Sequence, residues 1–210
     1  MNKRLVTVSC AACALAVSTL YAAHAHEHGV AKINASVEDQ AVTIELETPL
    51  DSALGFERAP NGAAEEQAVK DMAAKLRKAD ALFAFSPKAA CKLASVRLES
   101  EVLSAELLGE KAGGHAHHDD DHDHDADRED HEREHDGDHD DHDEHEHEAH
   151  ADLDAEFAFV CQNPKALSKI DVNLFKSFPK LNKIEAQIVT AKGQSAVELT
   201  AKNATIKIAQ

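Results

Sequence analysis

The feature that most constrains this chain is a segment of 36 residues, positions 115–150, in which His and acidic residues alternate. It contains 12 His, 18 Asp or Glu and two Arg, and it has no aliphatic residue larger than Ala. Such a segment cannot bury enough apolar surface to offset the entropy lost on ordering. We therefore expect a disordered insert over residues 113–151 when no ligand is bound.

The formal net charge of −17 is concentrated in this segment. Residues 115–150 carry 18 acids against two Arg, a net charge of −16, so the rest of the chain sums to about −1. Nucleic acid is disfavoured as a partner, because phosphate binding needs a basic patch. An anionic membrane surface is disfavoured for the same reason.

Repeated Asp-His and Glu-His pairs place imidazole beside carboxylate throughout the segment. Acids alone would suit Ca²⁺ or Mg²⁺, whereas imidazole with carboxylate favours Zn²⁺, with Cu²⁺, Ni²⁺ or Co²⁺ possible in vitro. A solubilising acidic spacer is the alternative interpretation. The predicted ligands here are His115, His117, His118, His122, His124, His131, His135, His139, His142, His145, His147 and His150.

The first 25 residues have the pattern of a secretory signal peptide. A basic start precedes an apolar run over residues 5–20 and an A-x-A cleavage sequence at 23–25. The run is short for a membrane span, which needs about 20 residues. Acylation of Cys10 or Cys13 is disfavoured, because neither has an aliphatic residue three positions earlier. We expect an exported protein without a membrane anchor.

Cleavage after Ala25 would leave a mature chain that begins His26-Glu27-His28-Gly29. His26 and His28 are candidate ligands of a second metal site, which the following strand could anchor to the fold. The alternative is a frayed terminus that binds no metal.

The mature chain would retain two cysteines, Cys91 and Cys161, on either side of the insert. Two Cys in an exported chain favour a disulfide, which would close a loop of about 70 residues and contribute roughly 4 kcal/mol in the chain-entropy model. Two buried free thiols are an alternative. A thiolate metal pair is disfavoured, because an oxidising compartment competes for the sulfurs.

About 147 residues lie outside the signal peptide and the insert, the size of one domain, so we expect a single zinc-binding domain over residues 26–210. Alternating apolar residues predict strands at 31–37, 42–46, 96–102, 157–161, 184–188, 197–199 and 206–208.

One helix is predicted between the first hairpin and the next strand. Its expected N-cap is Asn61, and its apolar stripe is Val69, Met72, Leu76 and Ala79, continued by Phe83. The predicted fold class is α+β, a mostly antiparallel sheet with one long helix and short helical turns. The insert interrupts this fold between two strands.

Several stretches together resemble a known family. They are HEHGVAKINAS from His26, GFERAP at 55–60, a lone Cys91, the His/Asp insert, FAFVCQNP at 157–164 and LFKSFPKL at 174–181. The chain resembles the ZrgA-type family of periplasmic zinc-binding proteins of Gram-negative bacteria. The resemblance implies an α/β domain with a His-rich disordered insert, a periplasmic location and a role in zinc acquisition alongside a zinc importer.

The resemblance also bears on the stretch at 55–60. The family pattern there is G-F-E-H-A-P, and this chain has Arg58 at the position of the His. A guanidinium stays protonated and has no lone pair to offer a metal. If the His of the family pattern is a metal ligand, an ordered site in this chain would therefore need another ligand.

The leading hypothesis is a periplasmic zinc-binding protein that captures or buffers Zn²⁺ and supports an inner-membrane zinc importer or its binding protein. A copper- or nickel-sequestering protein for metal tolerance is the alternative. A zinc hydrolase is disfavoured, because outside the insert and the N-terminal cluster the chain has no His. The two-lobed binding subunit of a zinc importer needs more than about 147 ordered residues, and the chain is not expected to be an enzyme.

Overall fold

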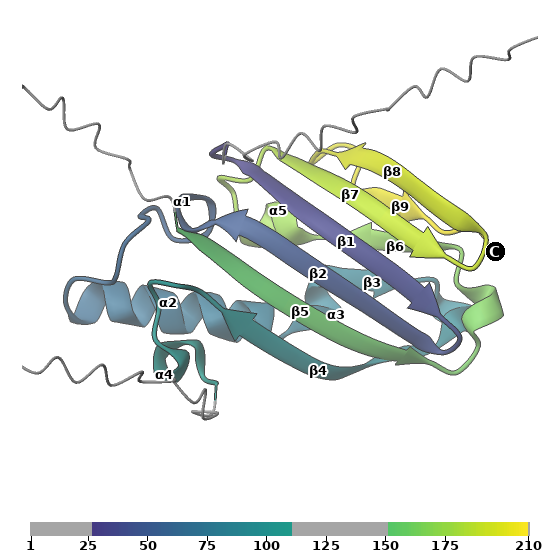
Figure 1. The fold of residues 1–210 in the computed structure, drawn as a ribbon, viewed down its shortest axis with the longest axis horizontal. Helices are drawn as coiled ribbons and strands as arrows, with labels where there is room; N and C mark the ends of the chain where they lie inside the picture. Colours follow the sequence, from purple (N-terminus) through teal and green to yellow (C-terminus); the bar gives the residue numbers. More distant parts are fainter. Residues whose placement is uncertain (1–26, 111–150, 210) are drawn as a thin grey trace, which may run out of the picture.

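The computed structural model describes residues 27–110 and 151–209, which form two sheets and several short helices (Figure 1). The larger sheet has six strands in the order β4-β5-β2-β1-β7-β8. β1 and β7 run parallel, and the other neighbours in this sheet are antiparallel. Its strands are β1 (Val30–Glu38), β2 (Ala41–Pro49), β4 (Cys91–Glu99), β5 (Asp152–Cys161), β7 (Lys183–Thr190) and β8 (Gly193–Leu199).

A smaller antiparallel sheet and the helices form a second layer. The sheet has the order β3-β6-β9, with β3 at Phe83–Phe85, β6 at Lys169–Val172 and β9 at Thr205–Lys207. The helices are α1 (Leu50–Ala53), α2 (Ala63–Leu76), α3 (Ala79–Leu82), α4 (Ala105–Leu108) and α5 (Leu174–Ser177), with 3₁₀ turns η1 (Pro87–Ala89) and η2 (Pro164–Ala166).

The core lies between the two layers. Alternate side chains of the large sheet, such as Ile33, Ile44 and Phe157, point to one face and are fully buried. Phe83 of β3 meets Phe157 from the other layer, edge to face, with ring centroids 5.1 Å apart. In Figure 1 the small sheet and most helices lie behind the large sheet. The opposite face of the large sheet, called the outer face below, is uncovered over the described residues.

The structure confirms a mixed fold of helices and strands in which most strands pair antiparallel, as the predicted α+β class implies. Among the described residues α2 is the one long helix, with 14 residues, and each other α-helix has four. The three-stranded sheet and the parallel pairing of β1 with β7 were not predicted. Of the strands of the small sheet, β9 overlaps the strand predicted at 206–208, whereas β3 and β6 were not predicted. Segments of three or four residues show little of a period of two, and local alternation does not report strand direction.

The predicted course of the helix was partly wrong. Val69, Met72 and Leu76 are buried on α2 as expected, but α2 ends at Leu76, and Ala79 and Phe83 belong to α3 and β3. Both residues are nevertheless buried, so the apolar spacing continued across a break in the helix.

The N-cap of α2 also differs from the prediction. Gly62, with φ of 86°, is the N-cap instead of Asn61. The backbone N–H of Asn61 donates to Glu65 Oε2 at 2.6 Å, so a carboxylate from the first turn satisfies the backbone before the helix.

The predicted insert follows α4, so a short helix separates it from β4, and the described chain resumes at Ala151. Ala151, predicted to be the last residue of the disordered insert, instead belongs to the folded part. It is buried, and its carbonyl accepts a hydrogen bond from Leu50 N at 2.9 Å. Val102 and Ile208, two of the expected strand residues, lie just beyond the ends of β4 and β9.

Cys91 and Cys161 form the predicted disulfide, with the sulfurs 2.01 Å apart. The two residues face each other in the antiparallel register of β4 and β5, so the bond links the strands on either side of the insert. Both sulfurs are thus unavailable as thiolate ligands.

Candidate metal-binding site

Of the predicted His ligands, the structure describes one, His28. His26 and the twelve His of residues 115–150 lie outside the described residues, as does the predicted signal peptide at 1–25. Within residues 27–110 and 151–209, no three His, Cys, Asp or Glu side chains are gathered so that they could hold a metal ion.

His28 contacts a carboxylate that sequence reasoning did not assign to the site. Its Nε2 atom lies 3.0 Å from Glu57 Oε1. The His28 side chain is 55% exposed, whereas that of Glu57 is 17% exposed. An imidazole open to solvent therefore stands beside a carboxylate that the fold partly encloses. Each is a type of side chain that binds zinc.

Backbone contacts around Gly29 position His28. The Gly29 N–H donates to Ser52 Oγ of α1 at 2.9 Å in a buried bond, and its carbonyl accepts from Asn182 N at 2.8 Å. Gly29 has φ of 81°, and a Cβ there would collide with the Asn182 side chain. The start of β1 is thus attached both to α1 and to the segment before β7.

Glu57 lies in the loop between α1 and α2, and its neighbour Arg58 ties that loop to α2. Arg58 donates through Nη1 and Nη2 to the two carboxylate oxygens of Glu65, at 2.7 and 2.9 Å. The guanidinium also lies over the Phe56 ring, 5.3 Å from its centroid. Hydrogen bonds from Arg58 and from the Asn61 backbone lower the pKa of Glu65 to about 2.

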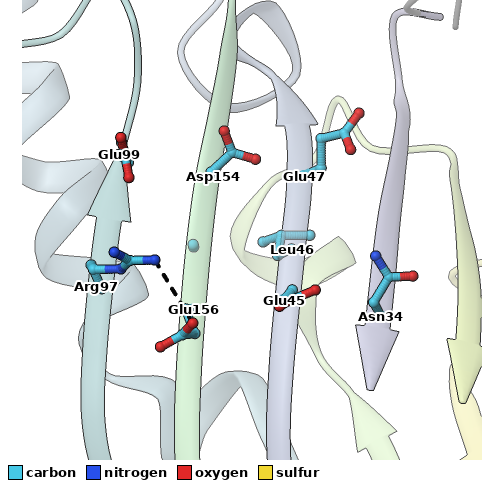
Figure 2. A pocket seen from close by; sticks show the side chains of 9 residues that line it. Asn34, Glu45, Leu46, Glu47, Arg97, Glu99, Asp154 and Glu156 are labelled. Carbon is cyan, nitrogen blue, oxygen red and sulfur yellow. Dashed lines mark ion pairs between the residues drawn. The ribbon is translucent and has the colours of Figure 1, made fainter. Parts of the chain in front are cut away.

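Apart from the contact between His28 and Glu57, several acidic side chains gather on the outer face of the large sheet, and Figure 2 shows them in detail. A groove of about 360 Å³, called the acidic groove below, crosses β1, β2, β5 and β4. It is lined by Asn34, Glu45, Leu46, Glu47, Arg97, Glu99, Asp154, Ala155 and Glu156.

The strand register places like charges opposite one another in this groove. Glu47 and Glu99, on the two neighbouring strands, both pair with Asp154. Partial burial, followed by repulsion from Glu47, Asp152, Glu99 and Glu101, raises the pKa of Asp154 above its usual value. The groove residues include no His or Cys, so the groove lacks the soft or nitrogen ligands that favour zinc.

The groove could have been noticed in the sequence, because Glu45, Glu47, Asp154 and Glu156 occupy the polar positions of two alternating stretches. Sequence reasoning missed it because those positions signal only a solvated face until the strands are known to be neighbours. No alternating pattern or spacing in the sequence indicated the contact between Glu57 and His28.

The structure thus defines a class of protein: a small α+β domain with an imidazole–carboxylate contact at one end of its large sheet. Comparison with protein families places it more closely. The model of the ZrgA family of zinc uptake proteins matches residues 25–208, and the chain belongs to this family. The family resemblance is confirmed, and the protein has a zinc-related function. No curated protein matches the chain.

None of the helices formed by the described residues is both long enough and apolar enough to cross a membrane.

Proposed function

We propose that this protein captures or buffers Zn²⁺ in the periplasm and supports its uptake by an inner-membrane importer. The observation that carries the proposal is that a chain of the zinc uptake family holds 12 His and 18 acids within 36 residues. Imidazoles and carboxylates at this density offer many overlapping sets of zinc ligands. Each ion must order its own ligands, so such a segment is suited to loading and releasing several ions.

The proposed location rests on the N-terminal sequence. A basic start, an apolar run and an A-x-A sequence within the first 25 residues favour export. The disulfide between Cys91 and Cys161 supports an oxidising compartment.

The proposed role is binding without catalysis. A catalytic zinc needs three protein ligands on rigid elements and an open coordination position. His28 is the one His in the described part of the chain, and its carboxylate neighbour is Glu57. This pair supports metal binding, and it falls short of the ligand set of a zinc hydrolase.

The metal bound in the cell tests the proposal. Protein isolated from its native periplasm, without a histidine tag and without added metal, should contain zinc in excess of copper and nickel by elemental analysis. Copper outcompetes zinc at most nitrogen-rich sites in vitro, so the native material is the decisive sample. Protein loaded chiefly with copper or nickel would replace the zinc proposal with a role in metal tolerance.

A further inference from the structure

We propose that Glu57 is a zinc ligand together with His28, and that the bridge between Arg58 and Glu65 holds Glu57 in place. This inference rests on the proposed zinc binding and adds to it a site on the folded domain, separate from residues 115–150.

The separation of the donor atoms fits a shared ion. Two ligands at about 2.0–2.2 Å from a tetrahedral Zn²⁺ lie roughly 3.3 Å from each other. His28 Nε2 and Glu57 Oε1 are 3.0 Å apart, so a small movement of the exposed imidazole brings both to bonding distance. Glu57 Oε1 is shielded from solvent by the fold and faces the imidazole.

Both ligands are held by the fold. The backbone after His28 is fixed by the Ser52 and Asn182 bonds to Gly29, and the side chain of Glu57 is largely enclosed. A pre-organised pair loses little entropy when it binds, whereas ligands in a low-complexity segment must first be ordered. The pair should therefore bind its ion more tightly than two donors of the same types in the segment.

The positive charge of Arg58, next in sequence to Glu57, does not stand against this assignment. Its guanidinium makes a bidentate bridge with Glu65, and the low pKa of Glu65 keeps that carboxylate ionised at neutral pH. The bridge is neutral as a unit. It joins the residue after Glu57 to the first turn of α2, and the Phe56 ring packs beneath the guanidinium.

Two protein donors suit an ion that is passed on. Structural zinc sites use four protein ligands, and a site with two leaves positions for water or for ligands from an acceptor. An ion at His28 and Glu57 is thus accessible from outside on the side of the exposed imidazole. The ligand class is a borderline divalent cation, with Zn²⁺ as the cargo.

The test observes His28 in the full-length mature protein. Its imidazole resonance is identified with a His28→Asn variant, and Zn²⁺ is then titrated against a competing chelator. The matched pair of variants is Glu57→Gln and Glu66→Gln. Glu66 lies in the first turn of α2, the helix that follows the loop of Glu57, so both changes remove one negative charge from the same part of the chain.

We expect Glu57→Gln to weaken zinc binding at His28 by about tenfold or more, on the scale of changes around metal ligands. Glu66→Gln should leave it unchanged, and both variants should keep the total zinc capacity of the chain. Unchanged binding at His28 in Glu57→Gln would overturn the inference. If His28 does not respond while other imidazoles bind zinc, only this inference fails. If the protein binds no zinc at all, the proposed function fails with it.

The bridge is tested from both ends. Arg58→Gln and Glu65→Gln change the charge near the site in opposite directions, but both release Glu57. If the bridge positions Glu57, both variants weaken zinc binding at His28, and neither adds to the effect of Glu57→Gln in a double variant. If Arg58→Gln strengthens binding while Glu65→Gln weakens it, the bridge acts through charge and the positioning role is wrong.

Discussion

Two regions of this protein are rich in acid, and they differ in what accompanies the carboxylates. Residues 115–150 mix 18 acids with 12 His. The acidic groove on the outer face contains five carboxylates, of Glu45, Glu47, Glu99, Asp154 and Glu156, and no His among its lining residues. The first region has the ligand mixture that zinc favours, and the second is an oxygen-only surface.

Basic side chains offset part of the negative charge of the groove. Lys32 forms an ion pair with Glu47 at 2.7 Å, and Arg97 lies 3.8 Å from Glu156, a contact drawn in Figure 2. Asp154, between Glu47 and Glu99, keeps an unfavourable charge, as its raised pKa shows. Acid content alone is therefore a poor guide to metal binding. The imidazoles beside the acids make the difference.

The largest expected effect comes from removing the first region, residues 115–150. Replacing residues 115–150 by a short Gly-Ser linker should leave a folded protein that has lost most of its zinc stoichiometry, measured by calorimetric titration. About one equivalent should remain, bound at His28, and it should disappear when His26 and His28 become Ala. The domain should stay folded, because the disulfide and the pairing of β4 with β5 join the two sides of the insert.

The matched control neutralises the groove. The double variant Glu47→Gln/Asp154→Asn should keep the full zinc stoichiometry, because the groove offers no imidazole. The contrast between the two regions is wrong if the linker variant binds as much zinc as the intact chain. It is also wrong if the groove variant loses a comparable amount.

The second effect is the dependence of zinc uptake on pH. Imidazole titrates near 6.5, and the protonated ring cannot bind a metal, so uptake by residues 115–150 should fall sharply between about pH 7 and pH 5. Full protonation would also change the charge of the segment from −16 to −4, since it contains 12 His. Equilibrium dialysis across this range measures the effect. A flat profile would mean that carboxylates, which titrate near 4, are the dominant ligands.

Much of the fold was predictable where a local pattern determines it. The β1–β2 hairpin follows from alternating residues such as Ile33 and Ile44, with a polar turn at Asp39 whose φ of 51° suits Asp. Cys91 and Cys161 are the two cysteines that follow the predicted signal peptide, and they are bonded as predicted. The end of α2 was not predictable from its apolar residues, because Ala79 and Phe83 continue the spacing into other elements.

The candidate site was predictable only in part. His28 was identified from its neighbours in the sequence, but Glu57 is brought to it by the turn of α1 and by the Ser52 bond to Gly29. No periodicity or spacing links residues on separate loops. The like-charge pairs of the groove depend in the same way on which strands are neighbours, a non-local property of the fold.

The smallest expected effect concerns the stability of the domain, and it isolates the charge of Asp154. A raised pKa in the folded state means that folding disfavours the ionised carboxylate, so this group lowers stability as the pH rises through its folded pKa. Asp154→Asn should therefore raise the free energy of unfolding at pH 7 by a few tenths of a kcal/mol, the scale of exposed cross-strand charge pairs. The gain should vanish in acid, where Asp154 is protonated in the wild type. Glu156→Gln, on the same strand and face but near Arg97, should bring no such gain in urea unfolding. An equal gain from both variants would mean that the whole face, and not the position of Asp154 between two acids, sets the repulsion.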